Sequence, residues 1–261
     1  MNERVHICAI AKNEGRYVRE WCLFHQIVGV EHITIYDNAS TDNMLEVLQP
    51  FIDSGFVDVM DWPRAKPSQF AAYQHYIDGH RGPWWTAFID IDEFLFSPQL
   101  DTISEVLAAI CQIISHSAIG VNWCCFGSGG QQNYFPFPVI ERFTWRAFTT
   151  NSVNDHIKSV IWMDQPVRVG GDPHLFEVAG GTFSESNARI TRPLSPHTSA
   201  LLRLNHYVTK SDEELDVKMA RGRADVVEFY VPGAFDGYNV REVDDREIQR
   251  FLPELKRRLN A

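Results

Sequence analysis

The first hundred residues alternate short apolar runs with stretches in which apolar residues recur at helical spacing. Continuous apolar runs are typical of strands buried on both faces of a parallel sheet, and apolar residues three or four apart indicate amphipathic helices. The runs that predict strands are Val5–Ala11, His32–Tyr36, Phe56–Met60 and Trp84–Ile91, and the stretches that predict helices are Tyr17–Val28, Met44–Ile52 and Ser68–His80. This order predicts a mostly parallel sheet with right-handed crossovers.

The pattern becomes less regular after a helix expected at about residues 102–115. A strand is expected at Ile119–Trp123, and a Gly-rich loop and a Pro-punctuated stretch follow it. Three later apolar runs predict extended segments, namely Ile157–Met163, Val167–Gly170 and Leu201–Tyr207. Ser211 and Glu214 form a capping box, which predicts a helix that continues to about residue 223. The chain contains no repeat, low-complexity tract or linker, so we predict a single domain over residues 1–261.

Composition and charge restrict the classes of partner and compartment. The chain carries 34 acidic and 24 basic side chains, a net charge of −10, which argues against nucleic acid as a partner. The five cysteines are odd in number and share no repeated spacing, which favours a reducing compartment over a disulfide framework. The first apolar run has only about seven residues, too few for a signal sequence or a membrane span. We therefore expect a cytoplasmic protein.

The strongest chemical signal is an apolar strand that ends in Asp90, Asp92 and Glu93. In open α/β sheets, ligands bind outside the carboxyl ends of the strands, where these side chains are expected. Asp90 and Asp92 are two residues apart, so on a strand they would point to the same side. Clustered carboxylates repel one another unless they are compensated, and a hard divalent ion completed by phosphate oxygens compensates them. The alternative is that one acid caps a helix while the others face water.

A second acidic segment, Ile35–Asp42, also lies where a strand turns into a helix. Its first acid, Asp37, can accept hydrogen bonds from a ribose hydroxyl or a base N–H, while the alternative is that Asp37 and Asp42 serve a turn and a cap. The first strand runs into Ala9–Glu14 rather than a G-x-G-x-x-G motif, and the chain has no P-loop. These absences argue against dinucleotide redox chemistry and P-loop phosphate transfer.

Several segments resemble the signatures of a known enzyme family. Ala11–Glu14, Tyr36–Asp42 and Phe88–Phe94 are similar to successive motifs of glycosyltransferase families 2 and 92. Five later blocks resemble family 92 (DUF23-like) more closely, namely Trp123–Gly130, Glu141–Phe143, His156–Val160, His174–Phe176 and Leu204–Ser211. The resemblance covers about residues 5–215. It departs from the family at Cys124 and Cys125, which replace more usual aromatic residues in a loop expected to face the acceptor.

The resemblance implies a GT-A-type α/β fold, with a mostly parallel central sheet flanked by helices. A Rossmann-like half at about residues 1–115 would bind a nucleotide sugar, residues 116–210 would bind the acceptor, and residues 211–261 would add C-terminal helices. The implied reaction is metal-dependent transfer of a hexose, with inversion, from a UDP-sugar to a hydroxyl of a glycan or glycolipid. Synthesis of a polysaccharide or lipopolysaccharide would be its context.

The resemblance also assigns roles to individual residues. Asp90 and Asp92 match the metal and diphosphate motif, with Asp92 as the direct ligand, and His206 matches a late histidine that ligates the metal. Neutral imidazole and carboxylates suit Mn²⁺, with Mg²⁺ as the alternative. Lys158 would balance the charge of the diphosphate, and His174 lies in the neighbouring block. The residues that match the nucleotide pocket are Ala9, Ala11, Asn13, Glu14 and Asp37.

An inverting transfer needs a general base that takes the proton of the acceptor hydroxyl. Glu141 is the candidate, because it follows the loop expected to face the acceptor. The alternative for Glu141 is an ion pair with Arg142 or Arg146, and Asp155 and Glu177 are further candidates for the base. An isolated histidine such as His25 is expected to have its hydrogen bonds satisfied or to be exposed, and not to be a ligand.

Two competing functions and one surface feature remain open at this point. A nucleotidyltransferase also pairs a metal with an α/β sheet, but Ala9–Glu14 lacks the Gly-rich, basic phosphate loop that it requires. A sugar-binding or scaffold protein without catalysis is the other alternative. The C-terminal tail carries an amphipathic stripe that either docks on the domain or rests, as a basic helix, on an anionic membrane surface. This stripe consists of Ile248, Phe251, Leu252, Leu255 and Leu259.

Overall fold

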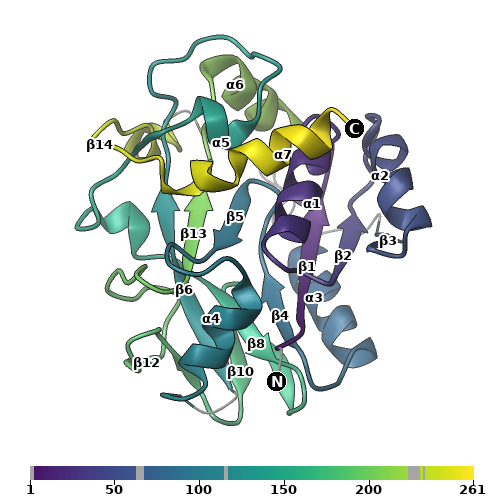
Figure 1. Cartoon of the computed structure of the whole chain (residues 1–261), viewed down its shortest axis with the longest axis vertical. Coiled ribbons are helices and arrows are strands. Elements are labelled where there is room, and N and C mark those ends of the chain that lie inside the picture. The colour runs from purple at the N-terminus through teal and green to yellow at the C-terminus, as the bar shows by residue number, and fades with distance from the viewer. Residues whose placement is uncertain (1–2, 63–67, 115–116, 223–229, 232) are drawn as a thin grey trace.

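The computed structural model describes residues 3–62, 68–114, 117–222, 230–231 and 233–261 (Figure 1). Its strands are β1 Val5–Ala11, β2 His32–Asp37, β3 Val57–Asp61, β4 Trp85–Phe88, β5 Glu93–Phe96, β6 Ala118–Cys125, β7 Trp145–Arg146, β8 Ile157–Trp162, β9 Val167–Asp172, β10 Leu175–Val178, β11 Thr182–Phe183, β12 Arg189–Ile190, β13 Arg203–His206 and β14 Val243–Asp244. Its α-helices are α1 Val18–Ile27, α2 Met44–Asp53, α3 Ser68–Gly79, α4 Ile103–Ile110, α5 Val139–Arg142, α6 Asp212–Arg221 and α7 Leu252–Leu259. Short 3-10 turns lie at Ser152–Asn154, Asp236–Tyr238 and Glu247–Phe251. The predicted alternation of strands and helices is confirmed.

The strands of the first hundred residues form the parallel part of the central sheet. β1 pairs in parallel with β2 and with β4, and β2 pairs in parallel with β3. Within the described residues, ten strands form this sheet, and its main path runs β12-β11-β6-β8-β4-β1-β2-β3. β8 runs antiparallel between β4 and β6, while β13 pairs in parallel with β6 and antiparallel with β5. The predicted fold class, α/β with a mostly parallel central sheet flanked by helices, is confirmed.

The pleat of β1 separates two hydrophobic cores. Successive residues of a strand point to opposite faces of the sheet. Ala9 and Ala11 belong to the larger core, which α1, α2, α4 and α7 also enter, whereas Cys8 and Ile10 join a smaller core with α3 (Figure 1). The two cores therefore lie on opposite faces of the sheet.

The loops that follow β1 and β2 are tied to each other by hydrogen bonds. Asn13 adopts a positive φ of 54°, and α1 begins at Val18. Its side-chain Oδ1 accepts from the backbone N–H of Thr41 at 2.7 Å, and its own N–H donates to Ser40 Oγ at 2.9 Å. Asp37 Oδ1 accepts from the N–H of Ser40 at 3.0 Å. These bonds fix the carboxyl ends of β1 and β2 in relation to each other.

The C-terminal helix α7 docks its apolar stripe on the domain. Leu255 is fully buried in the larger core, and Leu252 and Leu259 pack against that core. In Figure 1, α7 lies across α1. The expected docking is confirmed, and it leaves the membrane alternative without the apolar face that it requires. Among the described helices, none combines the length and apolarity needed to cross a bilayer.

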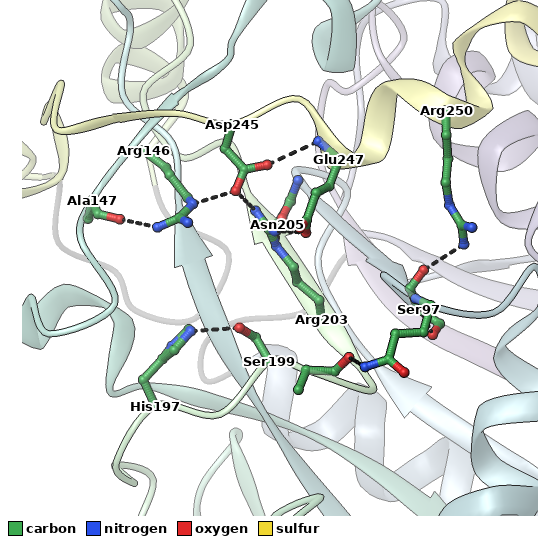
Figure 2. A network of polar contacts seen from close by, with 12 residues as sticks. Ser97, Arg146, Ala147, His197, Ser199, Arg203, Asn205, Asp245, Glu247 and Arg250 are labelled. Carbon is green, nitrogen blue, oxygen red and sulfur yellow. Dashed lines mark hydrogen bonds and ion pairs between the residues drawn. The ribbon is translucent and has the colours of Figure 1, made fainter.

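A cluster of buried charges attaches the segment before α7 to β13, and we call it the Arg203 cluster (Figure 2). Arg203 on β13 and Arg146 on β7 both donate to Asp245 Oδ2, at 2.9 and 2.6 Å. Arg203 also donates to Asn205 Oδ1 at 2.8 Å and to Glu247 Oε2 at 2.5 Å. Because the Arg203 and Asp245 side chains are only 4% and 5% exposed, their charges are compensated almost entirely by the protein itself.

Candidate functional site

A cavity of about 310 Å³ lies beyond the carboxyl ends of β1, β4 and β13, beside α6. The turn that follows β4 contributes Asp90, Ile91 and Asp92 to its wall. The remaining lining residues are Ile10, Lys12, Glu14, Gln69, Trp123, His174, His206, Val208, Lys218, Arg221, Gly222, Tyr230, Ala234, Phe235 and Tyr238. Ligands of open α/β sheets bind at this end of the strands, so this cavity is the candidate site.

The turn between β4 and β5 carries Asp90 and Asp92, and Glu93 stabilises this turn by a hydrogen bond. The strand predicted over Trp84–Ile91 ends at Phe88, so this turn, and not strand alternation, places Asp90 and Asp92 in the cavity wall. Glu93 Oε2 accepts from the backbone N–H of Asp90 at 2.8 Å, and its Oε1 accepts from Trp123 Nε1 at 2.6 Å. Burial raises the pKa of Glu93 to about 8, although Lys158 opposes this.

Each aspartate of the turn already has a lysine partner. Lys158 Nζ donates to Asp90 Oδ2 at 2.7 Å, and Lys218 Nζ donates to Asp92 Oδ2 at 2.7 Å. Burial works against ionisation of Asp92, but Lys218 and its other neighbours hold the pKa of Asp92 well below its usual range. Lys158 is only 1% exposed and is not part of the cavity wall. It therefore balances the charge of Asp90 in this structure, and the expected contact of Lys158 with a diphosphate stays a prediction.

Two of the predicted histidines reach the cavity as neutral rings. His206, at the end of β13, places Nε2 3.7 Å from Asp92 Oδ1, and burial lowers its pKa. His174 hydrogen-bonds through Nδ1 to the carbonyl oxygen of Ile157 at 2.9 Å, and burial lowers its pKa to about 3. Since a carbonyl oxygen only accepts, His174 carries its proton on Nδ1 and keeps a lone pair on Nε2. Both rings contact Trp123, with ring centroids 4.3 and 5.4 Å apart.

The predicted nucleotide-pocket residues divide according to the face of β1. Ala9 and Ala11 point into the larger core and are 0% and 2% exposed, so the expectation that they line the pocket is corrected. The alternate positions, Ile10 and Lys12, line the cavity in their place. Glu14 also lines it, and its Oε1 lies 2.5 Å from Arg221 Nη1.

Asn13 and Asp37 are absent from the wall of this cavity, within the part of the chain that the structure describes. Their side chains instead make the hydrogen bonds that join the loops after β1 and β2. This arrangement corresponds to the turn chemistry weighed above for Asp37. A role of these two residues in nucleotide binding stays a prediction.

The candidate base Glu141 lies outside the cavity wall, on α5. Its Oε1 is 2.5 Å from Lys256 Nζ of α7, in place of the pair with Arg142 or Arg146 considered above. Of the further candidates, Glu177 pairs with Arg168 at the surface, and neither Glu177 nor Asp155 lines the cavity. His25 is satisfied, one of the two outcomes expected for it, because its Nδ1 bonds to Trp21 O and its Nε2 accepts from Leu95 N–H.

Helix α6 supplies two cavity residues to which sequence reasoning assigned no role. Lys218 and Arg221 are three residues apart, so both lie on one face of the helix. The capping box at Ser211 located this helix correctly, and basic residues in its last turn were the available signal. Together with Glu14, Asp90, Asp92 and His206 they form what we call the cavity cluster.

The cavity cluster accommodates a divalent metal in part. Asp92 and His206 present an oxygen and an imidazole nitrogen on the same wall, which suits Mn²⁺, and His206 Nδ1 is buried without a hydrogen-bond partner in the described chain. Asp90, however, is turned toward Lys158 and Gln69. Consistently, the described residues bring no three His, Cys, Asp or Glu side chains into position around one metal. The fit is therefore to a metal with Asp92 and His206 as protein ligands, completed by substrate oxygens.

Comparisons with known proteins identify the segment that contains the two aspartates. A family model described as glycosyltransferase family 92 matches residues 7–119. A glycosyltransferase family 92 protein of Oryza sativa subsp. japonica is 39% identical over 103 residues, which are 39% of this chain and 18% of that protein. A galactan beta-1,4-galactosyltransferase of Arabidopsis thaliana is 28% identical over 133 residues, 45% of this chain and 25% of that protein. The matched segments thus cover 18% and 25% of the length of these two relatives.

Solved structures similar to this chain have lower sequence identity to it than the relatives above. S. aureus TarS residues 1–349 in complex with UDP-GlcNAc is 12% identical, with a TM-score of 0.46, over 98% of this chain and 72% of that one.

The family 92 match includes Asp37, Asp90 and Asp92 but ends before His206 and α6. The predicted resemblance to glycosyltransferase family 92 is therefore confirmed over residues 7–119 of this chain.

Proposed function

We propose that this protein is a GT-A-type glycosyltransferase that transfers a sugar from a nucleotide-sugar donor to an acceptor hydroxyl. One observation carries this proposal: the segment that matches family 92 contains Asp90 and Asp92, and both line the cavity beyond the carboxyl ends of the strands. The cavity, at about 310 Å³, falls at the lower end of the range for small-molecule sites.

The donor is a UDP-hexose and the acceptor a glycan or glycolipid hydroxyl, with inversion at the transferred carbon. The Arabidopsis relative is a galactosyltransferase by name, which supports a hexose as the transferred sugar. Glu141 is not carried into this proposal as the base, because Lys256 binds it outside the cavity wall. His174 offers the acceptor atom Nε2 to a sugar hydroxyl, since its proton is held on Nδ1 by Ile157.

Asp92 and His206 would hold Mn²⁺ or Mg²⁺ in the donor complex. A bound metal would supply Lewis-acid stabilisation of the charge that develops on the departing nucleoside diphosphate. The protein's own contribution is to fix these two ligands: Glu93 holds the turn that carries Asp92, and the Asp92 carbonyl accepts from the N–H of Tyr207, next to His206, at 2.9 Å.

The test is calorimetric binding of UDP, GDP and CMP, each with and without Mn²⁺. We expect UDP to bind in the presence of Mn²⁺, and Asp92→Asn to weaken this binding by about tenfold or more. Asp244→Asn is the matched control, because it makes the same chemical change in a surface pair with Arg246. Failure of every nucleotide to bind under any condition would reject the proposed donor site.

The two alternative functions give different results in turnover assays. A glycosyltransferase should slowly hydrolyse its nucleotide sugar in a metal-dependent reaction when no acceptor is present. Binding without hydrolysis or transfer would indicate a protein that has kept the site and lost catalysis. Formation of a nucleotide sugar from a nucleoside triphosphate and a sugar phosphate would indicate a nucleotidyltransferase.

A further inference from the structure

Lys218 lies in the cavity as the direct partner of Asp92. Its Nζ donates to Asp92 Oδ2 at 2.7 Å and to the carbonyl oxygen of Val208 at 3.0 Å. Its side chain is 13% exposed and the Asp92 side chain 8%, and both belong to the cavity wall. The ammonium group therefore competes with any other cation for this carboxylate.

Arg221, one turn later on the same face of α6, is held differently. Its Nη1 lies 2.5 Å from Glu14 Oε1 and donates to the backbone carbonyl oxygens of Lys12 at 2.9 Å and Asn13 at 3.3 Å. A planar guanidinium in such a set of bonds is fixed, whereas a lysine ammonium rotates on a flexible four-carbon chain. Arg221 thus clamps α6 to the end of β1, while Lys218 can exchange partners without movement of the helix.

A divalent cation at Asp92 changes the position of Lys218 by electrostatics alone. Two cations on one carboxylate repel each other, so the metal and Lys218 cannot both keep their closest contact with Asp92. The diphosphate of a nucleotide sugar brings new anionic oxygens into the same cavity. These oxygens provide Lys218 with a replacement partner within reach of its side chain.

We propose that Lys218 is a shared cation: it neutralises Asp92 in the donor-free protein and is transferred to the diphosphate when a divalent metal takes its place at Asp92. The inference rests on the proposed function, because it takes this cavity as the donor site. Metal alone binds weakly, since it must displace Lys218 in a cavity whose other acids, Glu14 and Asp90, are already paired with Arg221 and Lys158. Metal and diphosphate therefore bind with positive coupling, and each raises the affinity of the other by the same factor.

The test measures Mn²⁺ and UDP binding, separately and together, for the wild-type chain and two variants of opposite effect. Lys218→Met removes the competing charge, so we expect Mn²⁺ alone to bind roughly tenfold more tightly, UDP with Mn²⁺ to bind more weakly, and the coupling to fall. Lys218→Arg replaces the ammonium by a guanidinium group, which can bind Asp92 through two hydrogen bonds. Mn²⁺ alone should therefore bind to this variant more weakly than to the wild type. Lys256→Met is the matched control, because it removes an ion-paired lysine outside the cavity wall.

Opposite shifts in the two Lys218 variants cannot arise from a general loss of folding. Equal Mn²⁺ affinities in nucleotide-free wild type, Lys218→Met and Lys218→Arg would overturn the shared-cation proposal, as would the absence of Mn²⁺ binding in all of them. Failure of UDP to bind to any form would instead reject the donor site. The titrations with Mn²⁺ alone would still decide whether Lys218 competes with a metal for Asp92.

Discussion

Two clusters of buried charge, built from similar residue types, lie on opposite faces of β13. Arg203 and Asn205 point toward Asp245 and form the Arg203 cluster, whereas His206, on the alternate face, belongs to the cavity cluster. The Arg203 cluster joins cations and acids directly, and it has no part in the cavity wall. The cavity cluster also pairs acids with cations, yet its members border a space that a ligand can enter.

This difference shows which feature separates a structural charge cluster from a candidate site. Buried ion pairs occur in both, so neither burial nor pairing identifies function. The distinguishing feature is the cavity, which a ligand can enter. Substitutions should therefore affect stability most in the Arg203 cluster and ligand binding most in the cavity cluster.

Arg203→Met should produce the largest loss of stability. It would leave Asp245, 5% exposed, with one of its two arginine partners and would remove the donor to Asn205 Oδ1. Breaking a buried pair from one side costs about 3–5 kcal/mol, because a charge is left buried. Urea unfolding measures this cost, and UDP binding by the folded protein should remain unchanged. A cost below about 1 kcal/mol would show that the cluster contributes little to the fold.

Glu20→Gln tests the protonation state of a buried acid. The hydrogen-bond donors to the Glu20 carboxylate are backbone N–H groups. Glu20 accepts from Val139 N–H at 2.8 Å and from Ile140 N–H at 3.3 Å, and burial raises its pKa from 4.5 to about 7. The folded protein therefore keeps this proton at a pH where the unfolded chain has lost it. The contribution of Glu20 to stability is complete below pH 4.5 and is lost as the pH rises through 7.

Glutamine cannot titrate, so the wild type should lose about 1–3 kcal/mol relative to Glu20→Gln between pH 4.5 and 7.5. Urea unfolding of both proteins across this range measures the difference, which cancels titrations that the two share. Parallel stability curves would show that Glu20 is ionised in the folded protein throughout.

Lys218→Met removes a cation from the cavity cluster, as Arg203→Met removes one from the Arg203 cluster. We expect it to cost about 1–2 kcal/mol, less than Arg203→Met, because Asp92 borders the cavity, where solvent can replace the ammonium as its partner. The comparison of the two unfolding free energies measures how far the cavity hydrates its charges. Equal costs for the two variants would contradict the distinction drawn between the clusters.

The sequence predicts the sheet and the acidic turn because both depend on local pattern. Apolar runs and helical spacing located the first four strands and their helices, and Asp90 and Asp92 reach the cavity as expected. The face of β1 that borders the cavity is harder to predict. Alternate residues of a strand point to opposite faces, so a difference of one residue puts Ile10 and Lys12, and not Ala9 and Ala11, in the cavity wall. Local pattern does not say which face of β1 the cavity will occupy.

Long-range contacts account for the remaining differences between prediction and structure. Lys218 meets Asp92 across 126 positions of sequence, and Lys256 meets Glu141 across 115. The position of α6 depends on how the chain returns to the sheet after β13, which no local signal specifies. For this reason the sequence suggests a role for Glu141 but does not give its neighbours in space.

Glu141→Gln is expected to have the smallest effect and decides the role first suggested for this residue. The Glu141 and Lys256 side chains are 30% and 44% exposed, and solvent-accessible ion pairs contribute less than about 1 kcal/mol. Since Glu141 lies outside the cavity wall, initial rates of sugar transfer should remain within about twofold of wild type. Loss of a general base would instead reduce the rate by about 10²–10⁴-fold with donor binding intact. Such a loss would mean that the acceptor binds beside α5, and it would restore Glu141 as the base.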